Sequence, residues 1–406
     1  MNAAHRLIVL LLGVLVAWLG PLTSVQAVLG TAGQVPFYVN NGQQHTAMWV
    51  ESAAERGPPI GLFRTDTYTY DGAGNLKTIG AWSFEYDGVS RLTKATIYDE
   101  PVTPVTAKTQ SFVYDPWGNL KEIQGFNGRM IPVSATTNRL TSPGTTYDAA
   151  GNLLTWNQTP TQLANYSWDA LDRMWRMQNG SEEWLYLYTA DDERAWSYKV
   201  GGTLSRWTLR GLGGEVLREL EAANGTWTVT NDSIYRGDQL LAAQTPAGVR
   251  HYHLDHLGSP RLITNAAGAQ VAYHVYLPYG EESTAFNQDA LRMKFTGHER
   301  DLASSAGPGD DLDYMHARFC SPVTGRFLGV DASPGVPTKP QSWNGYAYAM
   351  SNPIARFDPD GHFGLGMFDI YPPNVGADES ECECSASGRI SDCDASGGSQ
   401  RWHPDG

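Results

Sequence analysis

The residues best suited to bind a metal ion stand in the stretch HYHLDH, at positions 251–256. His251 and His253 are two residues apart, so on a β-strand their side chains would point to the same face. Asp255 follows at the same spacing, and imidazole and carboxylate groups are common zinc ligands. The same residues also fit a strand that ends in an Asp-led turn. We therefore predict no metal ion and no other cofactor.

The sequence contains two pairs of adjacent aspartates, Asp191–Asp192 and Asp310–Asp311. Carboxylates of this kind act in glycosidases and bind Ca²⁺. Neither pair has the spacing of a known Ca²⁺ loop, and both fit solvated turns. The sequence also lacks a P-loop, a GxSxG nucleophile elbow and an HExxH motif. An independent enzyme on this scaffold is therefore not expected.

The elements that must position any functional residue are repeated turns. The units YDGAGNL, YDGVSRL, YDPWGNL, YDAAGNL and WDALDRM begin at positions 70, 86, 114, 147 and 168. The Asp can hydrogen-bond the backbone two residues on, and Gly-Asn tolerates the positive φ of a tight reversal. Alternating segments such as AWSFEY (81–86) separate the units. This pattern predicts successive hairpins that pair edge to edge into one antiparallel ribbon.

The composition agrees with a β-protein, because 43 Gly, 20 Tyr and 13 Trp favour short strands and tight turns over helices. The chain has 29 basic and 43 acidic residues, a net charge of −14. Binders of nucleic acid and of anionic membranes need a basic footprint. We therefore expect neither kind of partner.

The N-terminus resembles a secretory signal peptide. Arg6 precedes an apolar run from Leu7 to Gly20, and PLTSVQA follows with small residues. The run is shorter than the roughly 20 residues needed to cross a bilayer. We predict cleavage after residue 27, a secreted or periplasmic protein, and no membrane span once the signal is removed.

Four ordered blocks follow the repeats. They are HLDHLGSPRLITNAAGAQVAYHVYLPYGE (253–281), KFTGHERD (294–301), LDYMHARFCSPVTGRFLGVD (312–331) and SWNGYAYAMSNPIARFDPDG (342–361). Repeats and blocks together resemble the RHS or YD-repeat family, which includes teneurin-like shells, and the blocks resemble its RHS repeat-associated core domain. The resemblance implies an all-β fold, in which an antiparallel hairpin ribbon forms a spiral YD-repeat shell with a C-terminal core plug.

On this basis we divide the chain into five parts. They are a signal peptide (1–27), an N-terminal segment (28–65), the YD-repeat ribbon (66–250), the RHS-associated core domain (251–361) and a variable tail (362–406). If residues 66–285 form about twenty strands at ~4.8 Å spacing, the ribbon is roughly 95 Å long and could close into one ring about 30 Å across. We therefore expect a small or partial shell with little hollow space.

The resemblance also implies a reaction. In the family, the core can cut the chain just after its final DPxG box with two aspartates and an arginine. The matching positions are Asp331, Asp358 and Arg318. Two adjacent carboxyls do not both ionise easily, so one can hold a proton while the other activates water. The cut would fall near His362 and Phe363.

Two departures from the family pattern weaken this implication. The first box reads DASPG, where cleaving members usually have a DPxGL-like sequence. After the final box, His362 stands where those members have the Leu that precedes the cut. The block that resembles ARYYDP reads ARFCSP, so Cys320 and Ser321 replace a Tyr and an Asp. These departures favour a structural alternative, in which the two aspartates cap turns that close the sheet.

The functional prediction is a secreted RHS-repeat structural or interaction protein of a bacterial envelope or competition system. Three alternatives stay open: a self-cleaving shell that releases its tail, an adhesin that binds carbohydrate or a cell-surface protein through aromatic side chains, and a displaced fragment of a longer RHS protein. The expected partners are the chain's own tail inside the shell, or a sugar or cell-surface protein.

Overall fold

The computed structural model describes residues 37–40, 45–48, 67–99, 106–159, 162–202, 204–223, 225–285, 288–301, 311–333, 335–337, 339–362 and 365–366. The predicted signal peptide and the tail from residue 367 onward lie outside these described residues. Within them, no helix has the length and apolar character required to cross a membrane.

The ribbon consists of two antiparallel sheets in which each strand pairs with the next one along the chain. The first sheet has seven strands: β3 (Tyr68–Tyr70), β4 (Leu76–Ile79), β5 (Trp82–Tyr86), β6 (Leu92–Tyr98), β7 (Ala107–Tyr114), β8 (Leu120–Gly125) and β9 (Arg129–Met130). The second has 13: β10 (Thr146–Tyr147), β11 (Leu153–Thr159), β12 (Gln162–Trp168), β13 (Met174–Asn179), β14 (Glu182–Tyr188), β15 (Arg194–Lys199), β16 (Ser205–Arg210), β17 (Val216–Ala223), β18 (Thr226–Arg236), β19 (Gln239–Thr245), β20 (Gly248–Leu254), β21 (Pro260–Asn265) and β22 (Gln270–Tyr273).

The repeated Asp builds the turns as the sequence predicts. Asp115 Oδ1 accepts the backbone N–H groups of Trp117 and Asn119, each at 2.9 Å. Its Oδ2 accepts the Asn119 side-chain amide at 2.8 Å. Asp71, Asp87 and Asp169 make the same pair of backbone contacts two and four residues on. The turn at Asp148 differs, because this residue accepts from the third and fourth residues on.

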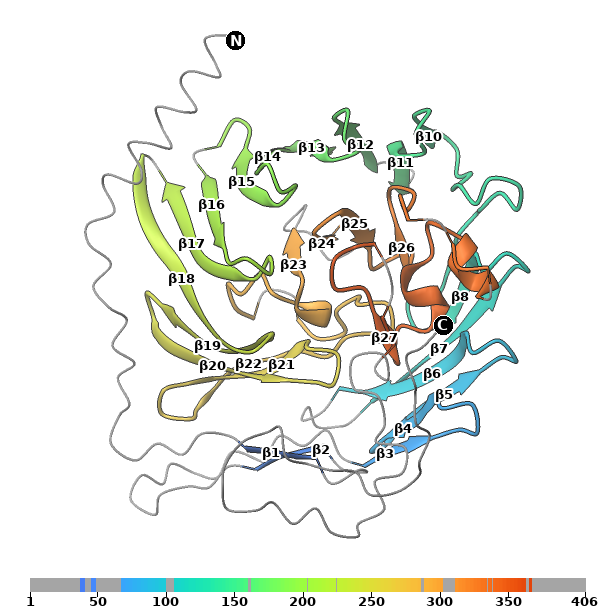
Figure 1. Cartoon of the computed structure of the whole chain (residues 1–406), viewed down its shortest axis with the longest axis horizontal. Coiled ribbons are helices and arrows are strands. Elements are labelled where there is room, and N and C mark those ends of the chain that lie inside the picture. Colours follow the sequence, from blue (N-terminus) through green and yellow to red (C-terminus); the bar gives the residue numbers. More distant parts are fainter. Residues whose placement is uncertain are drawn as a thin grey trace, which may run out of the picture.

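Figure 1 shows β3 to β22 running around a ring, with the later strands of the chain at its centre. The first and last parts of the ribbon meet. The Tyr68 and His256 rings pack edge to face at 5.4 Å, and the Arg261 guanidinium lies 4.6 Å from the centre of the Trp82 ring. The ribbon therefore closes into a single turn, which is one of the two outcomes that its length allows.

The plug inside the ring has little regular structure. A four-stranded sheet is formed by β23 (Glu299–Asp301), β24 (Leu312–Met315), β25 (Arg318–Ser321) and β26 (Arg326–Phe327). β27 (Arg356–Phe357) pairs with β28 (Leu365–Gly366). In the N-terminal segment, β1 (Phe37–Asn40) pairs with β2 (His45–Met48). Short 3₁₀ helices are η1 (Phe295–Gly297), η3 (Pro340–Trp343) and η4 (Tyr348–Ser351).

One hydrophobic core joins the ribbon to the plug. Along β7 the buried residues alternate with exposed ones, so that Gln110 and Phe112 face inward. The inward face of the ribbon, with Tyr166 and Tyr186, packs against plug residues such as Phe319 in one buried cluster. The described plug residues therefore pack directly against the inner face of the ribbon.

Plug asparagines also bond directly to the repeated turns. Asn344 Nδ2 donates to Asn119 Oδ1 at 2.9 Å, and Asn352 Nδ2 donates to Asn75 Oδ1 at 3.0 Å. Asn75 and Asn119, each the fourth residue after a repeated Asp, thus hold their turns together and also contact the plug. The all-β ribbon-and-plug prediction is confirmed. The ribbon sheet also includes β20, which crosses the expected boundary at residue 250, and β21 and β22, which follow it.

Candidate functional site

Three plug segments bring the predicted site residues together. Arg318 opens β25, Asp331 lies four residues after β26, and Asp358 directly follows β27. Arg318 Nη2 is 2.9 Å from Asp331 Oδ2 and 3.2 Å from Asp358 Oδ2. Because both carboxylate oxygens contact the same nitrogen, they lie within about 6 Å of each other. The three residues that the family resemblance singles out are therefore neighbours in space.

Arg318 is fixed in place by contacts on every side of its guanidinium. The group lies 3.6 Å from the centre of the Phe327 ring, and Nη1 donates to the Gly345 carbonyl at 2.9 Å. Nε donates to the carbonyl oxygen of Gly361, the last residue of the DPDG box. Burial lowers the pKa of Arg318, and the two carboxylates oppose this effect. A fixed cation is thus bonded to two peptide carbonyls, those of Gly345 and Gly361.

Asp358 is the buried carboxylate of the pair, with 1% of its surface exposed. Its Oδ1 accepts the backbone N–H of Gly361 at 2.9 Å and closes the turn of the DPDG box. Gly361 has φ +77°, and a Cβ at this position would overlap the Met315 carbonyl oxygen. The glycine therefore allows the box to approach the β24–β25 hairpin closely enough for Arg318 to reach its carbonyl.

Asp331 is the more accessible carboxylate, with 16% of its side chain exposed. Its Oδ1 accepts the Ser333 N–H at 2.8 Å and lies 3.9 Å from His362 Nδ1. The His362 backbone N–H donates to Asp360 Oδ1 at 3.0 Å. Both sides of the Gly361–His362 peptide bond therefore contact charged groups, and one carboxylate reaches solvent.

This arrangement contains the groups that peptide hydrolysis needs. A cation bonded to the carbonyl oxygen can stabilise the negative charge that develops there, and a solvent-accessible carboxylate can take a proton from water. Cys320 does not supply a nucleophile, because burial raises the pKa of its thiol well above the ordinary value. Although Cys320 departs from the family pattern, it leaves the carboxylate–arginine arrangement in place.

The other candidate residues have structural contacts. His253 Nε2 is 3.2 Å from Thr264 Oγ1, and burial lowers the pKa of His253 to about 4. Asp255 Oδ1 accepts two backbone N–H groups in the turn that follows. Asp192 pairs with Arg173 at the surface, at 2.7 Å. In the part of the chain that the structure describes, no three His, Cys, Asp or Glu residues are arranged to hold a metal ion.

Two exposed tryptophans bear on the adhesin alternative. Trp117 is 62% exposed at the tip of its turn, and Trp343 is 65% exposed in η3. Asn344 Nδ2 donates to the Trp117 carbonyl at 3.2 Å, so the two segments adjoin. No sugar-binding contact follows from this geometry, and carbohydrate binding stays a prediction.

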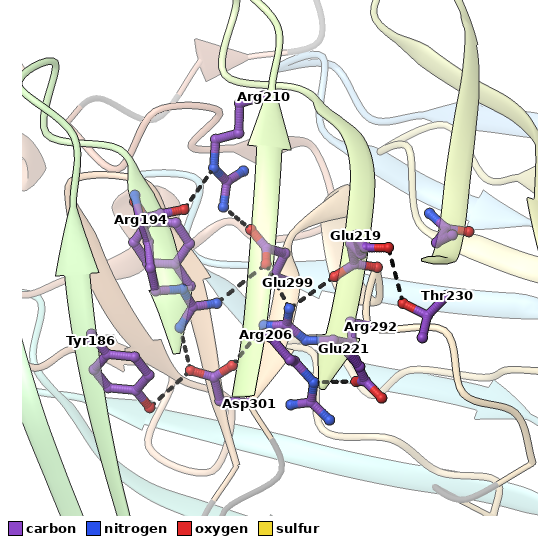
Figure 2. A network of polar contacts seen from close by, with 12 residues as sticks. Tyr186, Arg194, Arg206, Arg210, Glu219, Glu221, Thr230, Arg292, Glu299 and Asp301 are labelled. Atoms are coloured by element: carbon purple, nitrogen blue, oxygen red, sulfur yellow. Dashed lines mark hydrogen bonds and ion pairs between the residues drawn. The ribbon is translucent and has the colours of Figure 1, made fainter. Parts of the chain in front are cut away.

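Sequence reasoning missed a buried ion network between ribbon and plug (Figure 2). Arg292 Nη1 is 2.9 Å from Glu219 and 3.1 Å from Glu299, and its Nη2 is 3.0 Å from Asp301. Arg194 bonds both Glu299 and Asp301, and Arg210 bonds Glu299. These six side chains are at most 11% exposed. In the sequence, Glu299 and Asp301 flank Arg300, so on a strand both acidic side chains would point to the same face. This pattern could have indicated a charged cluster, but it does not identify the arginines that bind the two acids.

The chain was compared with protein-family models, with curated proteins and with solved structures. No family model matches the chain. It is 28% identical over 306 residues to the tRNA3(Ser)-specific nuclease WapA of Bacillus spizizenii, which covers 70% of this chain and 12% of that protein. It is 27% identical over 357 residues to the double-stranded DNA deaminase toxin A of Burkholderia cenocepacia, which covers 76% of this chain and 23% of that protein.

Among solved structures, a crystal structure of TcdB2-TccC3-Cdc42 matches with a TM-score of 0.57 at 20% identity, over 75% of this chain and 17% of the other. The chain therefore shares its fold with this part of the TcdB2-TccC3-Cdc42 structure. The Photorhabdus luminescens Tc holotoxin pore matches with a TM-score of 0.55 at 20% identity, over 73% of this chain and 16% of the other.

The chain is similar to RHS-repeat proteins, and the teneurin-like subtype stays a prediction. It spans about an eighth of the length of the WapA relative and about a quarter of the deaminase toxin.

Proposed function

We propose that this chain is an RHS-type shell protein whose plug cuts its own backbone directly after the DPDG box. The observation that supports the proposal is that Arg318 contacts Asp331 and Asp358 through Nη2 and the Gly361 carbonyl through Nε. The bond that this contact favours is Gly361–His362. Phe363 lies outside the described residues, so the expected cut next to it has no structural support of its own.

The proposed reaction begins at Asp331, because this carboxylate is the accessible one. It takes a proton from a water molecule, whose oxygen adds to the Gly361 carbonyl carbon. Arg318 stabilises the resulting oxyanion through Nε. The His362 nitrogen then takes up the proton, the C–N bond breaks, and the products are a Gly361 carboxyl group and a new amino group on His362.

Asp358 has a different part in this proposal. It holds the Gly361 N–H and one guanidinium nitrogen at the same time, and so fixes the distance between the carbonyl and Arg318. The proposal therefore gives the base step to the accessible Asp331, and it gives the buried Asp358 the positioning of the Gly361 carbonyl.

Conservative substitutions test the proposal. The chain is synthesised in a cell-free system, and the formation of a fragment that begins at His362 is followed by mass spectrometry. We expect Asp331→Asn, Asp358→Asn and Arg318→Gln each to slow the cut by about a hundredfold or more. Asp238→Asn, an exposed change in the β18–β19 turn, is the control and cuts at the wild-type rate. Equal rates in all five proteins would refute the proposal.

The released segment would be residues 362–406, and the setting we propose is a bacterial toxin or competition system. Two relatives that carry the words nuclease and toxin in their names support this setting. Export through residues 1–27 belongs to the same proposal. It predicts a mature N-terminus at Val28 when the protein is recovered from an exporting bacterial host, and an intact Met1 would contradict export.

A further inference from the structure

The tight turn between β24 and β25 contacts both the ribbon and the DPDG box. His316 Nδ1 is 2.8 Å from Glu193 Oε1 and 2.9 Å from Oε2, and Glu193 lies in the β14–β15 turn of the ribbon. The next residue, Ala317, donates its N–H to the Asp360 carbonyl at 3.1 Å. Arg318 follows at once and reaches Gly361. Three consecutive residues thus link the ribbon, the box and the candidate site.

This turn requires support. His316 has φ +54°, a left-handed conformation that costs a non-glycine residue about 1 kcal/mol or more. Its imidazole lies between Glu193 and the backbone of Gly214, where a Cβ would be 3.0 Å from His316 Cε1. Both of these contacts come from the ribbon. A ribbon that is not docked leaves the strained turn without them.

Arg194, the neighbour of Glu193, holds the same hairpin from its other side. Its backbone N–H donates to Tyr314 Oη at 2.8 Å, and its guanidinium lies 4.2 Å from the centre of the Tyr314 ring. Tyr314 pairs with Glu299 on one side and with Phe319 on the other. Figure 2 shows Arg194 reaching Glu299 and Asp301, which lie on the adjacent strand β23.

We propose that Glu193 and Arg194 are positioning residues for self-cleavage, so that the plug cuts only after the ribbon has docked. The inference rests on the proposed self-cleavage and adds its regulation. A misplacement of about 1 Å between a catalytic group and its target can cost a hundredfold in rate. If the ribbon does not hold the β24–β25 hairpin, Arg318 would move away from the Gly361 carbonyl. The cut would then be delayed until the ribbon has docked and the shell is closed.

The kinetic test compares two residues of one ribbon turn. Full-length chain is made by cell-free synthesis, and the cut is timed by mass spectrometry. Glu193→Ala is expected to slow the cut by about tenfold or more, because a hydrogen bond to a charged group is lost at the hairpin. Asp191→Ala, an exposed change two residues earlier, keeps the wild-type rate. Glu193→Gln, which retains a hydrogen-bond acceptor, restores most of the rate.

A second measurement reads the position of the hairpin without any cleavage. In the Asp358→Asn background, hydrogen exchange of the Ala317 amide is expected to rise by about tenfold when Glu193→Ala is added, and to stay unchanged with Asp191→Ala. Unchanged exchange and an unchanged rate for Glu193→Ala would overturn the inference and leave self-cleavage standing. Equal slowing by Asp191→Ala would also overturn it. A wild-type chain that stays uncut would refute the proposed self-cleavage itself, and the inference would then fail with it.

Discussion

Replacement of Glu299 by Gln tests whether the buried network holds the plug in the ring. Glu299 is 2% exposed and contacts three arginines, and the six charged groups of the network balance as three of each sign. Glu299→Gln keeps the shape and removes one charge. Breaking a buried ion pair by removing one partner costs about 3–5 kcal/mol, because an uncompensated charge stays buried.

Each arginine retains another partner, and this limits the cost. Arg194 keeps Asp301, Arg292 keeps Glu219 and Asp301, and Arg210 keeps Glu193 at 3.4 Å. We therefore expect a loss near the lower limit, about 3 kcal/mol in the free energy of unfolding. Burial would raise the pKa of Glu299, but the three arginines outweigh it and hold the pKa well below its usual range. The stability that Glu299 contributes is thus fully present at pH values above its pKa in the unfolded chain. It is lost as the pH falls toward its pKa in the folded protein.

The assay is urea unfolding at pH 7 in the Asp358→Asn background, which keeps the chain in one piece under the proposed mechanism. The control is Glu221→Gln. Glu221 also bonds an arginine, Arg206, in the region that Figure 2 shows, but these side chains are 32% and 23% exposed. Such pairs contribute about 0–1 kcal/mol. A loss below about 1 kcal/mol for Glu299→Gln, or equal losses for both variants, would refute the reasoning.

Three further predictions follow from individual contacts. Hydrogen bonds to Asp289 and Glu282 outweigh the effect of burial and raise the pKa of His274, so stability is full below about pH 6.5 and falls as pH rises through the folded value. Urea midpoints at pH 6 and 9 should show this fall in the wild type and not in His274→Gln. Asp115→Ala, which removes the acceptor of three N–H groups, should cost about 2–3 kcal/mol in urea unfolding, and a loss under 0.5 kcal/mol would contradict the turn role. Cys320 should resist thiol reagents at neutral pH until urea unfolds the chain, as peptide mapping would show, because it is buried and its pKa is raised. Labelling in the folded state would contradict this.

The turns could be predicted from the sequence because their chemistry is local. Asp115 and Asn119 are four residues apart, and the hydrogen bonds between them need no other part of the chain. The expected number of strands then gave the approximate length of the ribbon. Trp117 is an example of the limit of such local prediction. Its position in a turn could be predicted from the sequence, but its exposure and its neighbours in space could not.

The candidate site was predicted only through the family resemblance. Arg318, Asp331 and Asp358 have no fixed spacing that signals their meeting, and hairpin chemistry alone would leave both aspartates as turn caps. The structure gives Asp358 both roles, since it closes the turn at Gly361 and contacts Arg318. A turn role and a place in the site are therefore compatible, which the sequence could not reveal.

The ribbon-to-plug contacts could not be predicted at all. Glu193 and His316 are separated by 123 residues, and Arg194 and Glu299 by 105. An arginine on a half-buried strand usually faces solvent, and only the closed ring places it inside. These long-range contacts depend on ring closure, which no short pattern encodes.

The intact mass of the purified chain tests the central claim most directly. The wild type, kept at neutral pH and measured over time, is predicted to give one fragment that ends at Gly361 and a second that begins at His362. Asp358→Asn is predicted to remain a single chain. A wild-type chain that stays whole after long incubation, with a mass profile like that of Asp358→Asn, would contradict self-cleavage.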